Sequence, residues 1–143
     1  MMRFFNLYGE GQSEDFLIPS ILKQLPAGIV RLKDPEPRRD YLYIDDAVDA
    51  YVRAGEYEGT GFEFLNLGFG RSYAIDDIAR RVSLAWGSEV KITYEHERRR
   101  EEIMDVVADI TKARNLLGWQ PKVDFDRGLS KYVDWYRSQQ AAG

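Results

Sequence analysis

Short apolar segments typical of strands alternate along this chain with stretches in which apolar residues recur at helical spacing. The predicted strands cover residues 3–7, 29–32, 41–44, 62–67, 90–94 and 106–108. The predicted helices cover residues 16–25, 45 to 55 or 59, 75–86 and 109–117, and a last helix of about three to four turns begins near Phe125. This alternation favours an α/β fold with at least part of the sheet parallel. Because the segments are short and the loops many, we expect a small lobe rather than a full doubly wound domain.

Acidic residues and glycines mark where several of these helices begin and end. We expect Asp45 and Asp109 to cap helices, because a carboxylate accepts hydrogen bonds from the free N–H groups of the first turn. Gly87 and Gly118 follow helical stretches directly, where glycine readily adopts a left-handed conformation. Residues 68–70, Gly-Phe-Gly, are predicted to form a turn. They are not interpreted as a dinucleotide-binding fingerprint, because that motif needs a third glycine at the right spacing and an acid about 20 residues further on.

Composition argues against several classes of function. The 143 residues fit one domain over residues 1–143. A net charge of -4 and a pI near 5.1 argue against nucleic acid as a partner, which requires a broad basic surface. The chain has no apolar run of about 18 residues, so no membrane span is expected, and its N-terminus lacks a secretory pattern. It has no cysteine, and His96 is its single histidine, which argues against metal sites built from those residues. We expect a cytoplasmic protein without a metal site.

Charged residues are the first candidates for chemistry. Arg39 precedes an aromatic segment and has two interpretations. It is either a surface charge paired with Glu36 or Asp40, or a phosphate ligand, because a guanidinium matches two phosphate oxygens at once. The run Glu97–Glu102 is interpreted as a solvated loop with mutual ion pairs, and His96 beside it as an exposed loop residue.

Several segments, in a definite order, carry a family resemblance. They are Arg3-Phe4-Phe5-Asn6-Leu7-Tyr8-Gly9-Glu10-Gly11-Gln12, Arg39-Asp40-Tyr41-Leu42-Tyr43-Ile44-Asp45-Asp46, Asn66-Leu67-Gly68-Phe69-Gly70, Ala108-Asp109-Ile110-Thr111-Lys112-Ala113 and Leu117-Gly118-Trp119-Gln120-Pro121. Together they resemble the substrate half of the extended short-chain dehydrogenase/reductase family, the NAD-dependent nucleotide-sugar epimerases and dehydratases. The resemblance implies an α/β substrate-binding lobe that lacks most of the Rossmann domain, so the chain is expected to begin in the middle of an enzyme.

The resemblance also implies which residues bind the nucleotide-diphosphate sugar: Asn6, Arg39, Asn66, Arg99 and Glu102. In the family, two arginines contact the diphosphate, and Arg39 and Arg99 take their places. Arg98 replaces Arg99 if the alignment of this loop shifts by one residue. Glu102 takes the place of the family's acid, and Glu101 stands where glycine is usual.

The family's catalytic pair, Tyr-x-x-x-Lys, occurs nowhere in this chain. We therefore expect a nucleotide-sugar-binding portion that has no catalytic residue and binds no cofactor by itself, whereas the complete enzyme would use NAD. The alternative is a non-catalytic binding or assembly module, which acts with a separate cofactor-binding chain or as a homodimer. Phe4, Phe5 and Phe16 are candidates for the apolar patch of such an interface. The sequence leaves open the sugar, the base, and whether the enzyme is an epimerase (an isomerase) or a dehydratase (a lyase).

Overall fold

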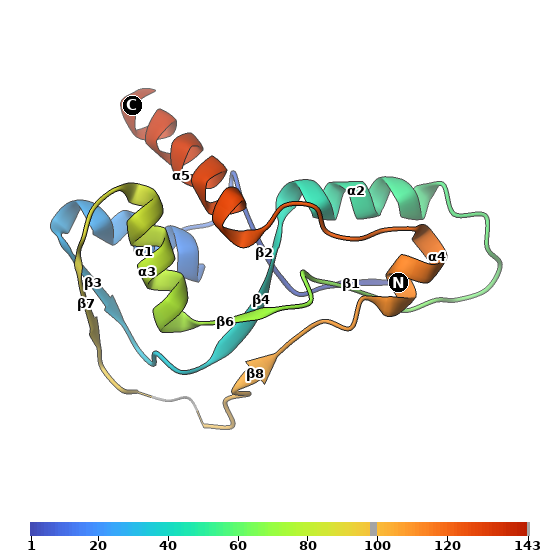
Figure 1. The fold of residues 1–143 in the computed structure, drawn as a ribbon, viewed down its shortest axis with the longest axis horizontal. Coiled ribbons are helices and arrows are strands. Elements are labelled where there is room, and N and C mark those ends of the chain that lie inside the picture. The colour runs from blue at the N-terminus through green and yellow to red at the C-terminus, as the bar shows by residue number, and fades with distance from the viewer. Residues whose placement is uncertain (98–99, 143) are drawn as a thin grey trace.

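The computed structural model describes residues 1–97 and 100–142 and has an α/β fold, as the sequence predicts. Its strands are β1 (Met2–Phe4), β2 (Asn6–Tyr8), β3 (Ile29–Leu32), β4 (Arg38–Tyr43), β5 (Leu65–Leu67), β6 (Ser72–Ala74), β7 (Lys91–Tyr94) and β8 (Asp105–Val106). Its helices are α1 (Leu17–Gln24), the short 3-10 helix η1 (Leu25–Ala27), α2 (Ile44–Gly55), α3 (Ile75–Trp86), α4 (Thr111–Leu117) and α5 (Phe125–Ala142). Figure 1 shows α1, α3, β3 and β7 at one end of the molecule, and α2, α4 and β1 at the other.

The strands form small sheets in which parallel pairing prevails. β1 pairs with β5, β2 with β4, and β3 with β7, each in parallel. The first half of β4 also pairs with β8 in parallel and with β6 in antiparallel orientation. β4 is therefore the strand that joins the two ends of the molecule, as Figure 1 shows.

The side chains of β4 divide two hydrophobic clusters. Tyr41 and Tyr43 belong to a cluster with α1, α3 and α5, whereas Leu42 belongs to a second cluster with α2, α4 and β5. All three side chains are buried. Successive side chains of a strand point to opposite faces, so one six-residue strand contributes to both clusters.

A buried carboxylate ties the loops to β4. Asp40 is 0% exposed and accepts hydrogen bonds from the backbone N–H groups of Phe69 at 2.7 Å, Gly70 at 2.9 Å and Ala108 at 3.0 Å. Gly68 approaches this carboxylate so closely that an added Cβ would lie 2.8 Å from its Oδ2. The Gly-Phe-Gly segment is thus a bend that packs on Asp40.

The predicted helix ends are confirmed in part. Gly87 and Gly118 end α3 and α4 with φ of 73° and 58°. The prediction that Asp45 caps a helix is wrong, because α2 begins one residue earlier, directly after β4, with Tyr43 as its N-cap. Asp45 lies in the first turn, where its carboxylate accepts a 2.6 Å hydrogen bond from Lys131. Asp109 precedes the N-cap of α4, yet its Oδ1 accepts the N–H of Thr111 at 2.9 Å.

Other predicted bounds differ from the structure. The strand predicted over residues 3–7 is divided at Phe5, because β1 and β2 pair with different strands. The strand predicted over residues 62–67 shortens to β5. α5 spans 18 residues and is longer than predicted, since its polar second half lacks the apolar spacing that marks a helix. Within the described part of the chain, no helix is both long and apolar enough to cross a membrane.

Candidate functional site

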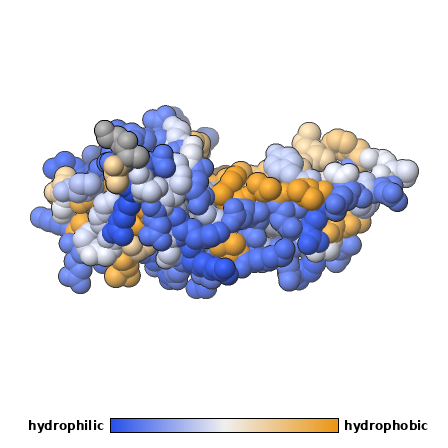
Figure 2. Space-filling model, turned by 90° about the horizontal axis from the view of Figure 1, so that it is seen from above, coloured by the Kyte–Doolittle hydropathy of each residue, from blue (hydrophilic) through white to orange (hydrophobic). Residues whose placement is uncertain are grey.

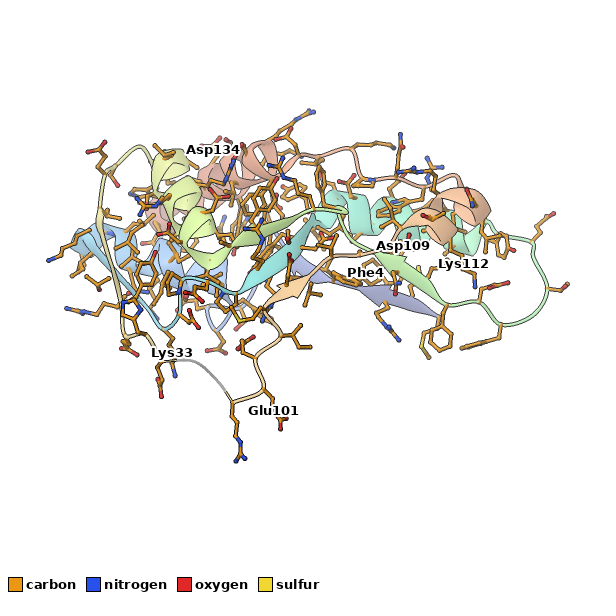
Figure 3. The ribbon with its side chains drawn as sticks, turned by 60° about the horizontal axis from the view of Figure 1, so that its bottom comes forward. Phe4, Lys33, Glu101, Asp109, Lys112 and Asp134 are labelled. Carbon is orange, nitrogen blue, oxygen red and sulfur yellow. The ribbon has the colours of Figure 1, made fainter. Side chains whose placement is uncertain are left out.

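A cavity of about 490 Å³ lies where β4 meets the loops around it. We call it the Arg39 pocket; its lining residues are Asn6, Asp15, Phe16, Leu17, Ser20, Arg31, Leu32, Lys33, Asp34, Pro37, Arg39, Tyr41, Ile75, Glu97 and Glu102. The lining comes from segments far apart in sequence, which is the arrangement expected of a ligand site rather than of a local turn. Figure 3 shows Lys33 and Glu101 on the loops at this side of the molecule.

Arg39 is held in the pocket by several partners. Its Nη2 forms an ion pair with Oε1 of Glu102. Its Nη1 donates to the backbone carbonyls of Arg38 at 2.7 Å and Ile103 at 2.8 Å. The side chains of Arg39 and Glu102 are only 22% and 14% exposed. The guanidinium is therefore fixed against the loop before β8 and shielded from much of the solvent.

Asn6 and Tyr41 face each other across the pairing of β2 with β4 and line the same pocket. The Nδ2 of Asn6 donates to the backbone carbonyl of Asp40 at 3.0 Å, which fixes the amide at the pocket wall. Burial raises the pKa of Tyr41 to about 12, although Arg39 nearby acts in the opposite direction. The Tyr41 hydroxyl is therefore protonated at neutral pH and can donate a hydrogen bond.

Tyr41 is a pocket residue that the sequence reasoning missed. It lies two residues after Arg39 on the same strand. Side chains two residues apart in a strand share a face, so the position of Arg39 contained the signal that could have identified Tyr41.

Acidic residues outnumber basic residues among the described lining of the Arg39 pocket. The basic residues are Arg31, Lys33 and Arg39, and the acidic residues are Asp15, Asp34, Glu97 and Glu102. Lys33 and Glu97 form an ion pair at 3.4 Å. An anionic ligand has to compete with these carboxylates for the cations of the pocket.

The structure brings together Asn6, Arg39 and Glu102 but not every predicted site residue. Asn66 lies on β5, opposite Arg3 of β1, and does not line this pocket. Arg99 lies outside the described residues, as does Arg98, so the convergence of two arginines on one ligand stays a prediction. Among residues 1–97 and 100–142, no group of histidine and acidic side chains could hold a metal ion.

A second cavity, of about 540 Å³, adjoins the Arg39 pocket and is largely apolar. We call it the apolar pocket; its lining residues are Phe4, Phe5, Asn6, Leu7, Tyr8, Gly9, Glu10, Gly11, Gln12, Ser13, Phe16, Leu17, Ile18, Tyr41 and Ile44. Asn6, Phe16, Leu17 and Tyr41 line both cavities, so these four residues lie where the two cavities meet.

Comparisons with known proteins agree on the type of protein that this chain is similar to. The family model described as GDP-mannose 4,6 dehydratase matches residues 1–132. UDP-glucose 4-epimerase of Mycolicibacterium smegmatis is 35% identical over 106 residues, which are 74% of this chain and 33% of that protein. UDP-glucuronate 4-epimerase of Thermodesulfobacterium geofontis is 28% identical over 138 residues, covering 94% of this chain and 42% of that protein.

Solved structures give the same result. UDP-glucose 4-epimerase with UDP-glucose from Thermotoga maritima superposes with a TM-score of 0.87 at 28% identity, covering 97% of this chain and 46% of that one. UDP-glucuronic acid 4-epimerase from Bacillus cereus, in complex with UDP-glucuronic acid and NAD, gives 0.88 at 26% identity, covering 96% and 45%. The chain thus spans less than half the length of these relatives.

Proposed function

This chain belongs to the GDP-mannose 4,6 dehydratase family, and we propose that it is the part of such an enzyme that binds the nucleotide-diphosphate sugar. The family membership confirms the resemblance drawn from residues 3–12 and 39–46 to the NAD-dependent nucleotide-sugar epimerases and dehydratases. The fold also agrees with a partial domain of these enzymes, because it superposes on about half of their length.

The observation that carries the proposal is the meeting of Asn6, Arg39 and Glu102 in one pocket. These residues come from β2, from β4 and from the loop before β8. A largely shielded guanidinium and an amide in one pocket offer several N–H donors to a phosphate group, and Tyr41 lines the same pocket. In this proposal Arg39 contacts the diphosphate together with Arg99, Asn6 forms the side wall, and Glu102 makes a further contact with the nucleotide. Asn66, the remaining residue that the resemblance implies, lies outside the Arg39 pocket, so the pocket does not support a ligand contact for it.

The chemical step would require the rest of such an enzyme. Relatives have been solved with NAD bound, and NAD would oxidise the sugar before epimerisation or dehydration. This chain contains neither Tyr-x-x-x-Lys nor a three-glycine dinucleotide fingerprint. We therefore propose that residues 1–143 bind the nucleotide sugar but do not catalyse its conversion by themselves. The complete protein would be an epimerase or a dehydratase that acts in the cytoplasm.

An exposed apolar surface favours the second candidate function, an assembly module. Val48, Tyr51 and Val52 form one exposed stripe of α2, at 53%, 57% and 56% exposure. Phe4 stacks on Tyr51 with ring centroids 5.0 Å apart and also lines the apolar pocket. Seen from above, the molecule carries an apolar strip along its middle (Figure 2).

Of the three phenylalanines predicted to form an apolar patch, Phe16 is exposed, whereas Phe4 and Phe5 are half-buried. All three line the apolar pocket. In this second candidate function, a separate cofactor-binding chain or a second copy would cover the α2 stripe and the apolar pocket.

Isothermal titration calorimetry with UDP-glucose tests the proposed function. We expect the wild-type chain to bind and Arg39→Ala to weaken binding by about 1–3 kcal/mol, the range for a charge-assisted hydrogen bond. Arg127→Ala is the matched control, because Arg127 is an exposed arginine on α5 outside the Arg39 pocket. Equal affinity of wild type and Arg39→Ala would contradict the proposal.

A further inference from the structure

The guanidinium of Arg39 has a limited set of donors left for a ligand. Its Nη1 already donates to the carbonyls of Arg38 and Ile103. A bidentate phosphate contact needs two neighbouring N–H groups on one edge, and the remaining edge is that of Nε and Nη2. Glu102 accepts from Nη2, which is one of the two donor atoms of this edge. A phosphate bound at this edge and the Glu102 carboxylate would therefore both use Nη2.

From this geometry we infer that Glu102 is an internal counter-ion, which an anionic ligand has to displace from Arg39. Glu102 would thereby lower the affinity of the Arg39 pocket for anions, because part of the binding free energy of a ligand is used to separate Glu102 from Arg39. The inference rests on the proposed function, since it deals with the same arginine. Once displaced from Arg39, the Glu102 carboxylate is free for the nucleotide contact proposed above, but its net effect on the affinity for a phosphate group is to lower it.

Burial and the charges nearby strengthen the ion pair between Arg39 and Glu102. The two side chains are mostly shielded from solvent, so their attraction is screened less than that of a surface ion pair. Acidic residues also outnumber basic ones in the described lining, so a neutral residue at position 102 would balance them. Glu102 lies in the loop between β7 and β8 and is not a strand residue, so its carboxylate can move without breaking a strand.

Binding of inorganic pyrophosphate, measured by calorimetry, tests the inference. Glu102→Gln keeps the shape of the side chain but removes its charge, and we expect it to bind pyrophosphate about threefold or more tightly than wild type. Glu102→Asp keeps the charge on a shorter side chain and should fall between the two. Glu58→Gln is the control, because Glu58 is exposed in the loop between α2 and β5 and removes the same charge elsewhere.

Unchanged or weaker binding of pyrophosphate by Glu102→Gln would overturn the inference. A gain that persists when Arg39→Ala is added would also overturn it, because the effect would then not act through Arg39. Circular dichroism of each variant establishes that it is folded before titration. If Arg39→Ala leaves UDP-glucose binding intact, the proposed function fails; if it weakens binding and Glu102→Gln gains nothing, only the counter-ion role fails.

Discussion

Arg39 and Asp40 are neighbours on β4, yet their side chains have different surroundings. Arg39 lines the pocket, whereas Asp40 is buried on the opposite face and accepts three backbone N–H groups. The sequence motif pointed to Arg39 as a phosphate ligand, and the structure places it in a cavity. The motif did not predict the partners of Asp40, because Phe69, Gly70 and Ala108 are far from Asp40 in sequence and only the fold brings them together.

Glu101 has a backbone conformation that is unusual for a residue with a side chain. By the family resemblance it stands where glycine is usual, and its φ of 64° is a left-handed backbone conformation that residues other than glycine rarely adopt. The motif alone raised the question of the loop's geometry. The loop thus keeps a conformation suited to glycine although glycine is absent.

We therefore expect Glu101→Gly to raise the free energy of unfolding by about 0.5–1 kcal/mol, since relief of left-handed strain exceeds the entropy cost of glycine. Glu101→Ala removes the same charge but keeps the Cβ, and it should leave stability near that of wild type. Urea denaturation followed by circular dichroism measures both. Equal stability of the glycine and alanine variants would mean that the backbone at Glu101 stores no strain.

Helices were easier to predict than strands at the scale of elements. Residues 75–86 match the bounds of α3, because one helix carries its own apolar periodicity and a glycine at its end. β4 begins at Arg38, three residues before the predicted strand. Arg38, Arg39 and Asp40 lack the apolar character of a strand, and they become one only because β6 and β8 pair with them.

The packing of α5 on β2 and β4 gives a prediction about this element. A Cβ added at Gly128 would lie 2.1 Å from the Tyr8 hydroxyl and 3.1 Å from the Tyr43 ring. Tyr8 is 2% exposed and its hydroxyl donates to the Phe125 carbonyl at 3.1 Å, so its ring has little room to move. We expect Gly128→Ala to lower the free energy of unfolding by about 1–3 kcal/mol through overpacking.

Gly55→Ala in α2 is the matched control for Gly128→Ala, because an added Cβ meets nothing within 4 Å there. Helix propensity alone favours alanine over glycine, so Gly55→Ala should be neutral or raise stability by about 0.5–1 kcal/mol. Chemical denaturation of both variants compares them. Stabilisation by Gly128→Ala would show that α5 does not pack against Tyr8 as the structure has it.

At the scale of the whole molecule, the α/β class and the partial-domain character followed from the sequence, whereas the arrangement in two clusters did not. The alternation of strands and helices is a local pattern that is visible in the spacing of apolar residues along the sequence. The division of the core by Tyr41, Leu42 and Tyr43 depends on which face of β4 each helix covers, and this is decided by long-range contacts. The same holds for the position of the Arg39 pocket next to the apolar pocket.

The exposed stripe of α2 leads to a prediction for the chain as a whole. Val48 and Val52 lie four residues apart on one helix face, and exposed apolar area of this kind favours association. We expect the isolated chain to self-associate, and the double variant Val48→Lys, Val52→Lys to be monomeric, as measured by light scattering coupled to gel filtration. Because both side chains are already exposed, the double variant should unfold at nearly the wild-type temperature.

Leu84→Lys is the control that distinguishes association through the α2 stripe from association through any exposed apolar side chain. Leu84, on α3, is 73% exposed and thus presents more of its side chain to solvent than either valine, but it lies outside the α2 stripe. If the α2 stripe is the interface, Leu84→Lys leaves the association unchanged while the α2 variant abolishes it. The stacking of Phe4 on Tyr51 places the α2 stripe beside the apolar pocket, so a chain bound to the stripe would also border the apolar pocket. Association that survives in the α2 double variant would remove this surface from the assembly hypothesis.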